Sequence, residues 1–156
     1  MRRLSIVLLL ACGLAACGEE SNRLYGSMSQ VYPLDFDRVR IIRISDTVSV
    51  TSNQVAIEYL RNKDQAKVAK LSVIVGDLAN MAGNEITLTE KVEGLPRGTI
   101  QRIESGTTDF PLEIGNVRFD QEPEVGTNLS GSFHTTLSDP AGRTLNGEFQ
   151  AKVEAP

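Results

Sequence analysis

The feature that most constrains the fold of this chain is a strict two-residue alternation near its carboxyl end. Residues 128–138 and 143–154 each place apolar or small side chains at every second position, with polar side chains between them. The recurring residues are Leu129, Gly131, Phe133, Thr135 and Leu137 in the first segment, and Leu145, Gly147, Phe149, Ala151 and Val153 in the second. Because successive side chains of a strand point to opposite faces, this pattern predicts two antiparallel strands with one buried and one solvated face.

The residues between these two segments predict the turn that joins them. Asp139, Pro140 and Gly142 occupy positions that type I turns favour, and Gly142 can adopt the left-handed conformation that closes a three-residue loop. Such a loop pairs Asp139 with Arg143. The register that follows sets Leu137 against Leu145, Phe133 against Phe149, Leu129 against Val153 and His134 against Glu148.

The rest of the chain from Leu24 onward also predicts strands, because Val, Ile and Thr recur in short runs that Gly, Asn, Asp and Pro separate. The predicted strands lie near residues 24–32, 37–45, 47–52, 54–61, 67–76, 85–92, 98–104, 110–120, 128–138 and 143–154. A helix competes at residues 54–70, where we favour a hairpin that turns at residues 62–65. The predicted fold is all-β, an antiparallel β-sandwich or a partly closed β-barrel of meanders, preceded by a cleaved signal helix.

The amino-terminal residues have the composition of a secretory signal. The positive start Met1-Arg2-Arg3 precedes an apolar run from Leu4 to Ala16, which ends in small residues. As a helix this run would span about 20 Å at about 1.5 Å per residue, well short of a hydrocarbon core of about 30 Å. The length therefore indicates a cleaved signal and not a transmembrane anchor.

The end of the apolar run, Leu14-Ala15-Ala16-Cys17, resembles the lipobox of bacterial lipoproteins. The resemblance covers residues 1–17, and it implies cleavage between Ala16 and Cys17 and a diacylglyceryl group on the Cys17 thiol. Leu9-Leu10-Ala11-Cys12 is a rival match, but a large leucine stands where the lipobox has a small residue. Cys12 would leave with the signal, so the mature chain would have no internal disulfide despite its oxidising compartment.

The predicted signal leaves one domain of ordinary size. We assign residues 1–16 to the signal, residues 17–23 to the lipidated cysteine and a short tether, and residues 24–156 to a single β domain. Lys and Arg number 16 and Asp and Glu number 20, and two of the arginines would leave with the signal. This acidic balance argues against nucleic acid as a partner. Residues 18–22 reach about 17 Å when fully extended, so the domain would lie close to its membrane.

One pair of side chains suggests chemistry. His134 is the only histidine of the chain, and the predicted register sets it opposite Glu148 on the polar face. A histidine that a carboxylate orients can act as a general base in a hydrolase. A flat, solvated sheet face provides no cleft, however, so we interpret this pair as structural. The sequence also lacks metal-ligand spacings, phosphate loops and nucleophile elbows, so we expect no metal, no cofactor and no enzyme activity.

These observations predict a small all-β lipoprotein of the bacterial envelope that binds and does not catalyse. Gly18 follows Cys17 where Asp is the familiar retention signal, which favours the outer membrane if the source has one. The expected partners are the membrane, through the lipid on Cys17, and an unidentified envelope protein or wall component. The alternative is a lipocalin-like carrier of a small apolar ligand, which requires a continuous apolar cavity. A hydrolase that uses His134 is the least favoured hypothesis.

Overall fold

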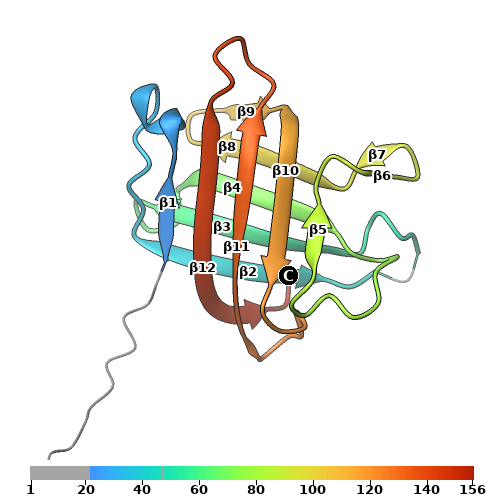
Figure 1. Ribbon diagram of the computed structural model, residues 1–156. Coiled ribbons are helices and arrows are strands. Elements are labelled where there is room, and N and C mark those ends of the chain that lie inside the picture. The colour runs from blue at the N-terminus through green and yellow to red at the C-terminus, as the bar shows by residue number, and fades with distance from the viewer. Residues whose placement is uncertain (1–21, 47) are drawn as a thin grey trace, which may run out of the picture.

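The strands of this protein form one curled sheet and one small ribbon (Figure 1). The structure, a computed structural model, describes residues 22–46 and 48–156. The elements of the sheet are β1 (Arg23–Tyr25), β2 (Arg38–Ile44), β3 (Gln54–Arg61), β4 (Ala66–Ile74), β5 (Glu85–Thr87), β8 (Gly98–Ile103), β9 (Thr107–Phe110), β10 (Leu112–Phe119), β11 (Asn128–Leu137) and β12 (Thr144–Glu154). The ribbon consists of β6 (Lys91–Val92) and β7 (Leu95–Pro96), and a 3₁₀ helix, η1 (Ser27–Gln30), follows β1.

The order of the strands explains the shape of the sheet. The main path runs β5-β10-β11-β12-β2-β3-β4-β8-β9, and β1 lies beside β12. Among the described strands the neighbours are antiparallel, except that β12 and β2 pair in parallel through Val153 and Ile41. Figure 1 shows β10, β11 and β12 crossing over β2, β3, β4 and β8, with β12 bending at its carboxyl end to join β2. The sheet thus curls into a half-barrel. The predicted all-β class is confirmed, and the partly closed barrel describes it better than the sandwich.

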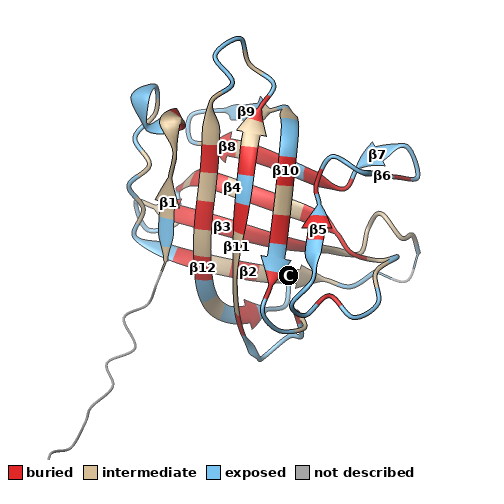
Figure 2. Ribbon diagram, viewed as in Figure 1, coloured by how far each residue is buried: buried red, intermediate tan, exposed pale blue. Residues whose placement is uncertain are grey.

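The two crossing layers bury apolar side chains between them. Figure 2 shows buried positions recurring along the crossing strands. Tyr59 packs edge-on against Phe36 and Phe133, with ring centroids 4.9 and 6.2 Å apart. Phe119 and Phe149 form a second edge-on pair at 6.0 Å. Four of these five rings, all except Phe36, are fully buried. Large side chains therefore occupy the interior of the half-barrel where a ligand carrier of the lipocalin type has its cavity.

The faces predicted for β11 and β12 are confirmed, but the predicted register is wrong. Phe133 pairs with Gly147, and Phe149 pairs with Gly131, so the two phenylalanines do not face each other. A Cβ atom on either glycine would lie closer than 3.0 Å to the ring of the phenylalanine across from it. Each Gly-x-Phe repeat thus supplies the space that the ring of the other repeat fills. This reciprocal packing, and not the turn, sets the register.

The loop between β11 and β12 is longer than predicted. The Leu137 N–H donates to the Arg143 carbonyl at 2.7 Å, so the loop comprises residues 138–142. Its type I turn is confirmed, because the Gly142 N–H donates to the Asp139 carbonyl at 2.9 Å and Gly142 has the left-handed φ of 56°. The Ser138 N–H donates instead to the carbonyl of Pro111 at 2.7 Å. This bond to the residue between β9 and β10 draws Ser138 out of the hairpin ladder.

The predicted hairpin at residues 62–65 is confirmed and joins β3 to β4. Asn62, Lys63 and Asp64 all have positive φ angles, of 55°, 54° and 70°. The Asn62 N–H donates to the Asp37 carboxylate at 2.9 Å, and Asp64 forms an ion pair with Arg38. Tertiary bonds to the start of β2 therefore hold this left-handed turn in place.

Three other predicted strands differ in the structure. The predicted strand 85–92 divides into β5 and β6, and the predicted strand 110–120 is interrupted at Pro111, which has no N–H to donate to a ladder. Within the predicted strand 47–52, Thr47 lies outside the described residues and the remainder forms a turn. The Ser52 hydroxyl donates to the Ser49 carbonyl at 2.9 Å in this turn. Such side-chain bonds to nearby backbone compete with strand pairing.

The outer face of β3 carries a buried carboxylate. Glu58 is 1% exposed and accepts hydrogen bonds from Arg40 Nε at 2.9 Å and from Lys67 Nζ at 2.6 Å. Burial alone would raise the pKa of Glu58, but the bonds from Lys67 and Arg40 outweigh it and hold that pKa below its usual value. The three side chains thus form an ion cluster that links β2, β3 and β4.

Candidate functional site

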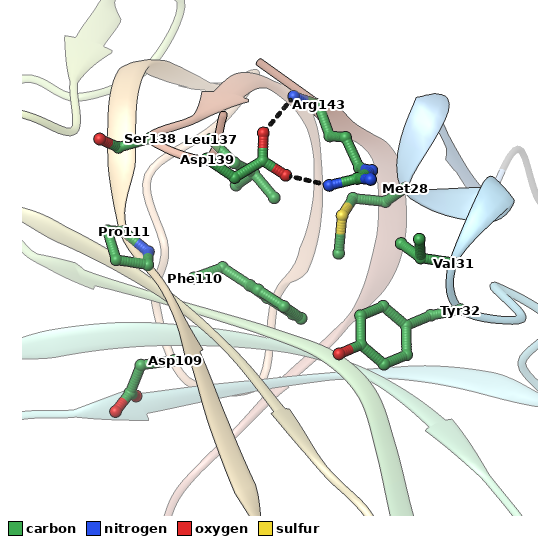
Figure 3. Close-up of a pocket in the computed structure, with 10 residues that line it drawn as sticks. All are labelled: Met28, Val31, Tyr32, Asp109, Phe110, Pro111, Leu137, Ser138, Asp139 and Arg143. Carbon is green, nitrogen blue, oxygen red and sulfur yellow. Dashed lines mark hydrogen bonds and ion pairs between the residues drawn. The ribbon is translucent and has the colours of Figure 1, made fainter. Parts of the chain in front are cut away.

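An apolar cleft of about 270 Å³ opens at the end of the half-barrel where β12 begins. Its lining combines segments that lie far apart in the chain: Met28, Val31, Tyr32, Asp109, Phe110, Pro111, Leu137, Ser138, Asp139 and Arg143. Figure 3 shows Met28, Tyr32 and Phe110 pointing toward one another, with the Asp139–Arg143 pair at the rim. An open apolar cleft with a few polar groups at its edge is the usual form of a binding site. We call this site the end cleft.

The position of η1 creates one wall of the end cleft, and it explains why the predicted strand 24–32 stops at Tyr25. At Gly26 the chain has a φ of 135° and touches the backbone of Thr144, where any Cβ atom would clash. The Thr144 N–H donates to the Ser27 hydroxyl at 2.9 Å, and the Ser27 N–H donates to the Thr144 hydroxyl at 3.1 Å. These bonds turn the chain into η1 at the start of β12 and carry Met28 into the core.

Tyr32 is held in the wall of the cleft by two neighbours. Its ring lies 5.8 Å from the ring of Phe110 and 5.0 Å from the guanidinium carbon of Arg102. Arg102 is 4% exposed and donates to the carbonyls of Pro33 and Val68 at 3.1 and 3.3 Å. A buried cation against an aromatic face stabilises the ring position. The aromatic wall is therefore preorganised by Phe110, which also lines the cleft, and by Arg102, which lies behind it.

Two aspartates border the end cleft, and they differ in their hydrogen bonds and ion pairs. Asp139 accepts the Arg143 backbone N–H at 2.9 Å and pairs with the guanidinium of the same residue, and the backbone bond in particular holds the pKa of Asp139 below its usual value. Asp109 accepts one hydrogen bond from Gln101 Nε2 at 2.7 Å. In the part of the chain that the structure describes, Asp109 forms no ion pair. Its negative charge thus has no ion-pair partner among those residues.

A second cleft of about 320 Å³ lies on the other side of residues 109–111, which we call the corner because they join β9 to β10. Its lining residues are Leu88, Thr89, Pro96, Gly98, Thr99, Ile100, Asp109, Phe110, Pro111 and Leu112. Here β8 and β10 are bridged by a single residue: the Leu88 N–H donates to the Gly115 carbonyl at 2.7 Å, and the Leu88 carbonyl accepts the Gly98 N–H at 2.8 Å. The strands β8 and β10 do not pair with each other directly, and the second cleft lies at this place, where the sheet does not close into a full barrel.

The residues that the sequence singled out lie away from both clefts or outside the described residues. Ala16 and Cys17 belong to the latter group, so the lipobox interpretation stays a prediction. His134 is exposed and pairs with Asn146, whereas Glu148 pairs with Ser132, so the predicted His134–Glu148 cross-strand pair is wrong. Both side chains line one shallow polar hollow of about 460 Å³ on the outer face of β11 and β12.

The structure also bears on metals and membranes within residues 22–46 and 48–156. In that part of the chain, no three His, Cys, Asp or Glu side chains come together as ligands for a metal ion. The same residues contain no helix of the length and hydrophobicity that membrane crossing requires. Neither result identifies a residue that could hold a cofactor.

Taken together, the fold and the clefts define a small all-β protein with a curled half-barrel sheet. Comparisons with protein families, with curated proteins and with solved structures give no match to this chain.

Sequence reasoning missed the end cleft because no local pattern encodes it. The cleft combines Tyr32, Phe110 and Leu137, which lie in different parts of the sequence and come together only in the folded protein. The sequence did contain one signal for this site. Aromatic residues are few, at 5% of the chain, and two of them, Tyr32 and Phe110, adjoin a proline, where a strand commonly ends. Aromatic residues next to strand ends are candidates for the rim of a barrel.

Proposed function

We propose that this chain is a lipid-anchored lipoprotein of the bacterial envelope, attached through Cys17, whose end cleft binds another envelope component without catalysis. The observation that carries the anchoring is the sequence Leu14-Ala15-Ala16-Cys17 at the end of an apolar run, five residues before the first described residue, Asn22. The outer membrane is the favoured location because Gly18, and not Asp, follows the cysteine.

The contacts of Asn22 support a short tether with a defined exit point. The Gln150 N–H donates to the Asn22 side-chain carbonyl at 2.6 Å, and the Asn22 amide donates to the Gln150 carbonyl at 3.2 Å. The side chain of Asn22 thus bonds the edge of β12 as a neighbouring strand would. An anchor at Cys17 would hold this edge of β12 within about 17 Å of the membrane.

This exit point supports a location of the end cleft away from the proposed anchor. Arg143 immediately precedes β12 and Gln150 lies within it, and at about 3.3 Å per residue they are about 23 Å apart along the chain. In the register of β1 with β12, Arg23 lies opposite Glu148 in the middle of β12, and Figure 1 shows η1 beside the start of that strand. An anchored domain would therefore open its end cleft toward the side that faces away from the bilayer.

The volumes favour a protein partner over the carriage of a small ligand. Sites for small ligands commonly enclose about 300–1,000 Å³, whereas the end cleft is open and holds about 270 Å³. Tyr59, Phe119, Phe133 and Phe149 fill the interior that a lipocalin-like carrier would use. An open apolar cleft with a polar rim suits one large side chain of a partner, which is how interface hot spots are built.

The hydrolase hypothesis has the least support. A nucleophile, a base and an orienting acid must converge. His134 is exposed on a sheet face and lies opposite an amide, Asn146, while Ser132 lies opposite Glu148. His134→Ala is therefore expected to leave the envelope function of the protein unchanged, and loss of that function with normal folding would restore the enzyme hypothesis.

Anchoring is tested by replacing each cysteine of the signal region. Cys17→Ala is expected to accumulate as the uncut precursor and to lose incorporation of radiolabelled palmitate, whereas the matched control Cys12→Ala should be cut and labelled like the wild type. Gel mobility, palmitate labelling and membrane fractionation measure these outcomes. Normal processing and membrane attachment of Cys17→Ala would overturn the anchoring proposal.

Binding at the end cleft is tested separately by photocrosslinking in intact envelopes. A benzoylphenylalanine at Val31, which is 48% exposed in the cleft, is compared with one at Val125, which is 54% exposed elsewhere. We expect a discrete adduct from position 31 that position 125 does not give. Equal adducts from both positions, or none from position 31, would contradict a partner site at this cleft.

A further inference from the structure

The end cleft and the second cleft share the corner residues Asp109, Phe110 and Pro111. The two hollows therefore lie on either side of one narrow ridge, at the place where β9 ends and β10 begins. Their volumes of about 270 and 320 Å³ lie just below and at the lower end of the range of about 300–1,000 Å³ for small-ligand sites, so each is too small for a whole lipid and has room for a large apolar side chain. This arrangement describes one groove with two subsites and a central ridge, which we call the corner groove.

Apolar surface extends from the corner groove along neighbouring segments. The structure exposes five large apolar side chains among the described residues: Val31, Val48, Leu95, Ile114 and Val125. Val31 lines the end cleft, and Leu95 precedes Pro96 of the second cleft. Two of the five thus belong to segments that form the groove, whereas Ile114 precedes the buried Gly115 and lies on the outer face of β10. Apolar side chains that gather around a groove are typical of a protein-binding surface.

The charges of the groove restrict what its occupant can be. The Asp139 carboxylate at one end accepts hydrogen bonds from both the backbone N–H and the guanidinium of Arg143, so Arg143 already neutralises its charge. Asp109, on the shared ridge, accepts a neutral amide from Gln101 and has no ion pair within the described residues. An occupant with a cation at the ridge would complement this charge, whereas an acidic occupant such as a fatty acid would meet repulsion.

The strand that ends at the ridge favours an extended occupant. β9 is the last strand of the sheet, so one of its edges has no neighbour among the described strands. The strand is short, contains Asp109 and is followed by Pro111, all features that discourage pairing between identical edges. A second copy of this chain would also bring a second uncompensated carboxylate to the ridge. These features point to a different partner.

We propose that the corner groove binds an extended peptide segment of an envelope protein, in which apolar side chains enter the two clefts and a neighbouring lysine or arginine pairs with Asp109. The proposal rests on the binding function proposed above and adds the chemistry of the partner. It does not depend on lipidation of Cys17, because the groove lies within the folded domain.

The test uses two fluorescent peptides that differ in charge, acetyl-Lys-Leu-Phe-Leu-Lys-amide and acetyl-Glu-Leu-Phe-Leu-Glu-amide. The full chain is purified from membranes and placed in phosphatidylcholine nanodiscs, with empty nanodiscs as the background, and anisotropy measures the affinity. The basic peptide should bind at least threefold more tightly than the acidic one at low salt. Asp109→Asn should lower the affinity for the basic peptide about threefold to fivefold, as expected for a rim ion pair. The control Asp120→Asn makes the same charge change on the polar face, where Asp120 lies 3.8 Å from Arg118, and should have no effect.

Two further measurements separate the outcomes. Val31→Gln should weaken binding of the basic peptide, because it places a polar side chain in the apolar end cleft without a change of charge. Salt at 0.5 M should erase the difference between the wild type and Asp109→Asn, because rim charges are screened. Equal binding of both peptides, or no effect of Asp109→Asn, would overturn the cationic partner. Binding of the dye N-phenyl-1-naphthylamine to the wild type, its loss in Val31→Gln, and no binding of either peptide would assign the groove to a small apolar ligand. A crosslink at position 31 with no peptide selectivity would leave the proposed binding function intact and refute this inference alone.

Discussion

Gly147→Ala tests the packing that sets the register of the β11–β12 hairpin. A Cβ atom at this position would lie closer than 3.0 Å to the Phe133 ring and to the Tyr59 hydroxyl. Both of these neighbours are fully buried, so neither side chain can move into solvent to make room. The added methyl group must therefore shift two rings of the core.

The cost of this substitution follows from the contacts. Overpacking a filled core costs about 1–3 kcal/mol, and the upper half of that range applies because the neighbours are aromatic and enclosed. Moving Tyr59 also strains the hydrogen bond from its hydroxyl to the Glu148 carbonyl, which is 2.9 Å long and worth about 1 kcal/mol. We expect Gly147→Ala to lower the free energy of unfolding by about 3 kcal/mol, which corresponds to a fall in Tm of about 10 °C for a domain of this size.

Urea unfolding followed by far-UV circular dichroism measures the effect, since the chain has no tryptophan for fluorescence. The matched control is Gly106→Ala, because a Cβ atom there meets nothing within 4 Å and the φ angle suits any residue. Adding Tyr59→Phe to Gly147→Ala should recover about 1 kcal/mol relative to the sum of the two single changes. Equal urea midpoints for Gly147→Ala and Gly106→Ala would refute the packing, and would favour the register in which Gly147 faces Thr135.

Three further predictions concern charges and backbone conformation, all measured by urea unfolding. Glu58→Gln should lower the free energy of unfolding by about 2 kcal/mol at pH 7, because two cations lose their buried partner. Since the folded pKa of Glu58 is lowered, this difference between the variant and the wild type should persist above about pH 4.3 and shrink as the pH falls further. Lys63→Gly should gain about 0.5 kcal/mol by relieving a φ of 54°, whereas Lys70→Gly within β4 should lose about 1 kcal/mol, and a loss at both positions would contradict the turn. Arg97→Lys should lower the free energy of unfolding by about 2 kcal/mol. Arg97 is 3% exposed and bonds both carboxylate oxygens of Asp77 at 2.7 and 2.8 Å, a geometry that lysine cannot reproduce. An unchanged urea midpoint would show that the paired bonds are dispensable.

The buried faces of β11 and β12 were predictable because they depend on parity alone. A shift of the register by an even number of residues keeps Phe133 and Phe149 on the inner face, so the alternation survives an error in the turn. The register itself was not predictable from turn chemistry, because the bond between Ser138 and Pro111 comes from another part of the chain. The two Gly-x-Phe repeats contained the missing information, since a ring and a glycine complement each other across a strand pair.

The candidate site was far less predictable than the fold. Its first wall depends on Gly26. Close contact with Thr144 turns the chain there, whereas the sequence pattern predicts that the strand continues. Its ridge depends on Pro111, which ends one ladder and starts another. Both residues are ordinary strand terminators in the sequence. Their spatial coincidence at one end of the half-barrel arises only when β12 crosses the second layer.

The course of β12 gives the proposed anchor and the proposed groove a fixed relation. Near its start the strand bonds Ser27 and borders the end cleft, in its middle it bonds Asn22, and at its end it pairs with β2. Because β11 pairs with it along most of this length, the strand cannot hinge between Thr144 and Gln150. If Cys17 carries the lipid, we expect the groove to lie on the side of the domain that faces away from the bilayer. A partner would then have to approach from the aqueous space and not from within the same membrane, so lengthening the tether with flexible residues should leave binding of the basic peptide unchanged.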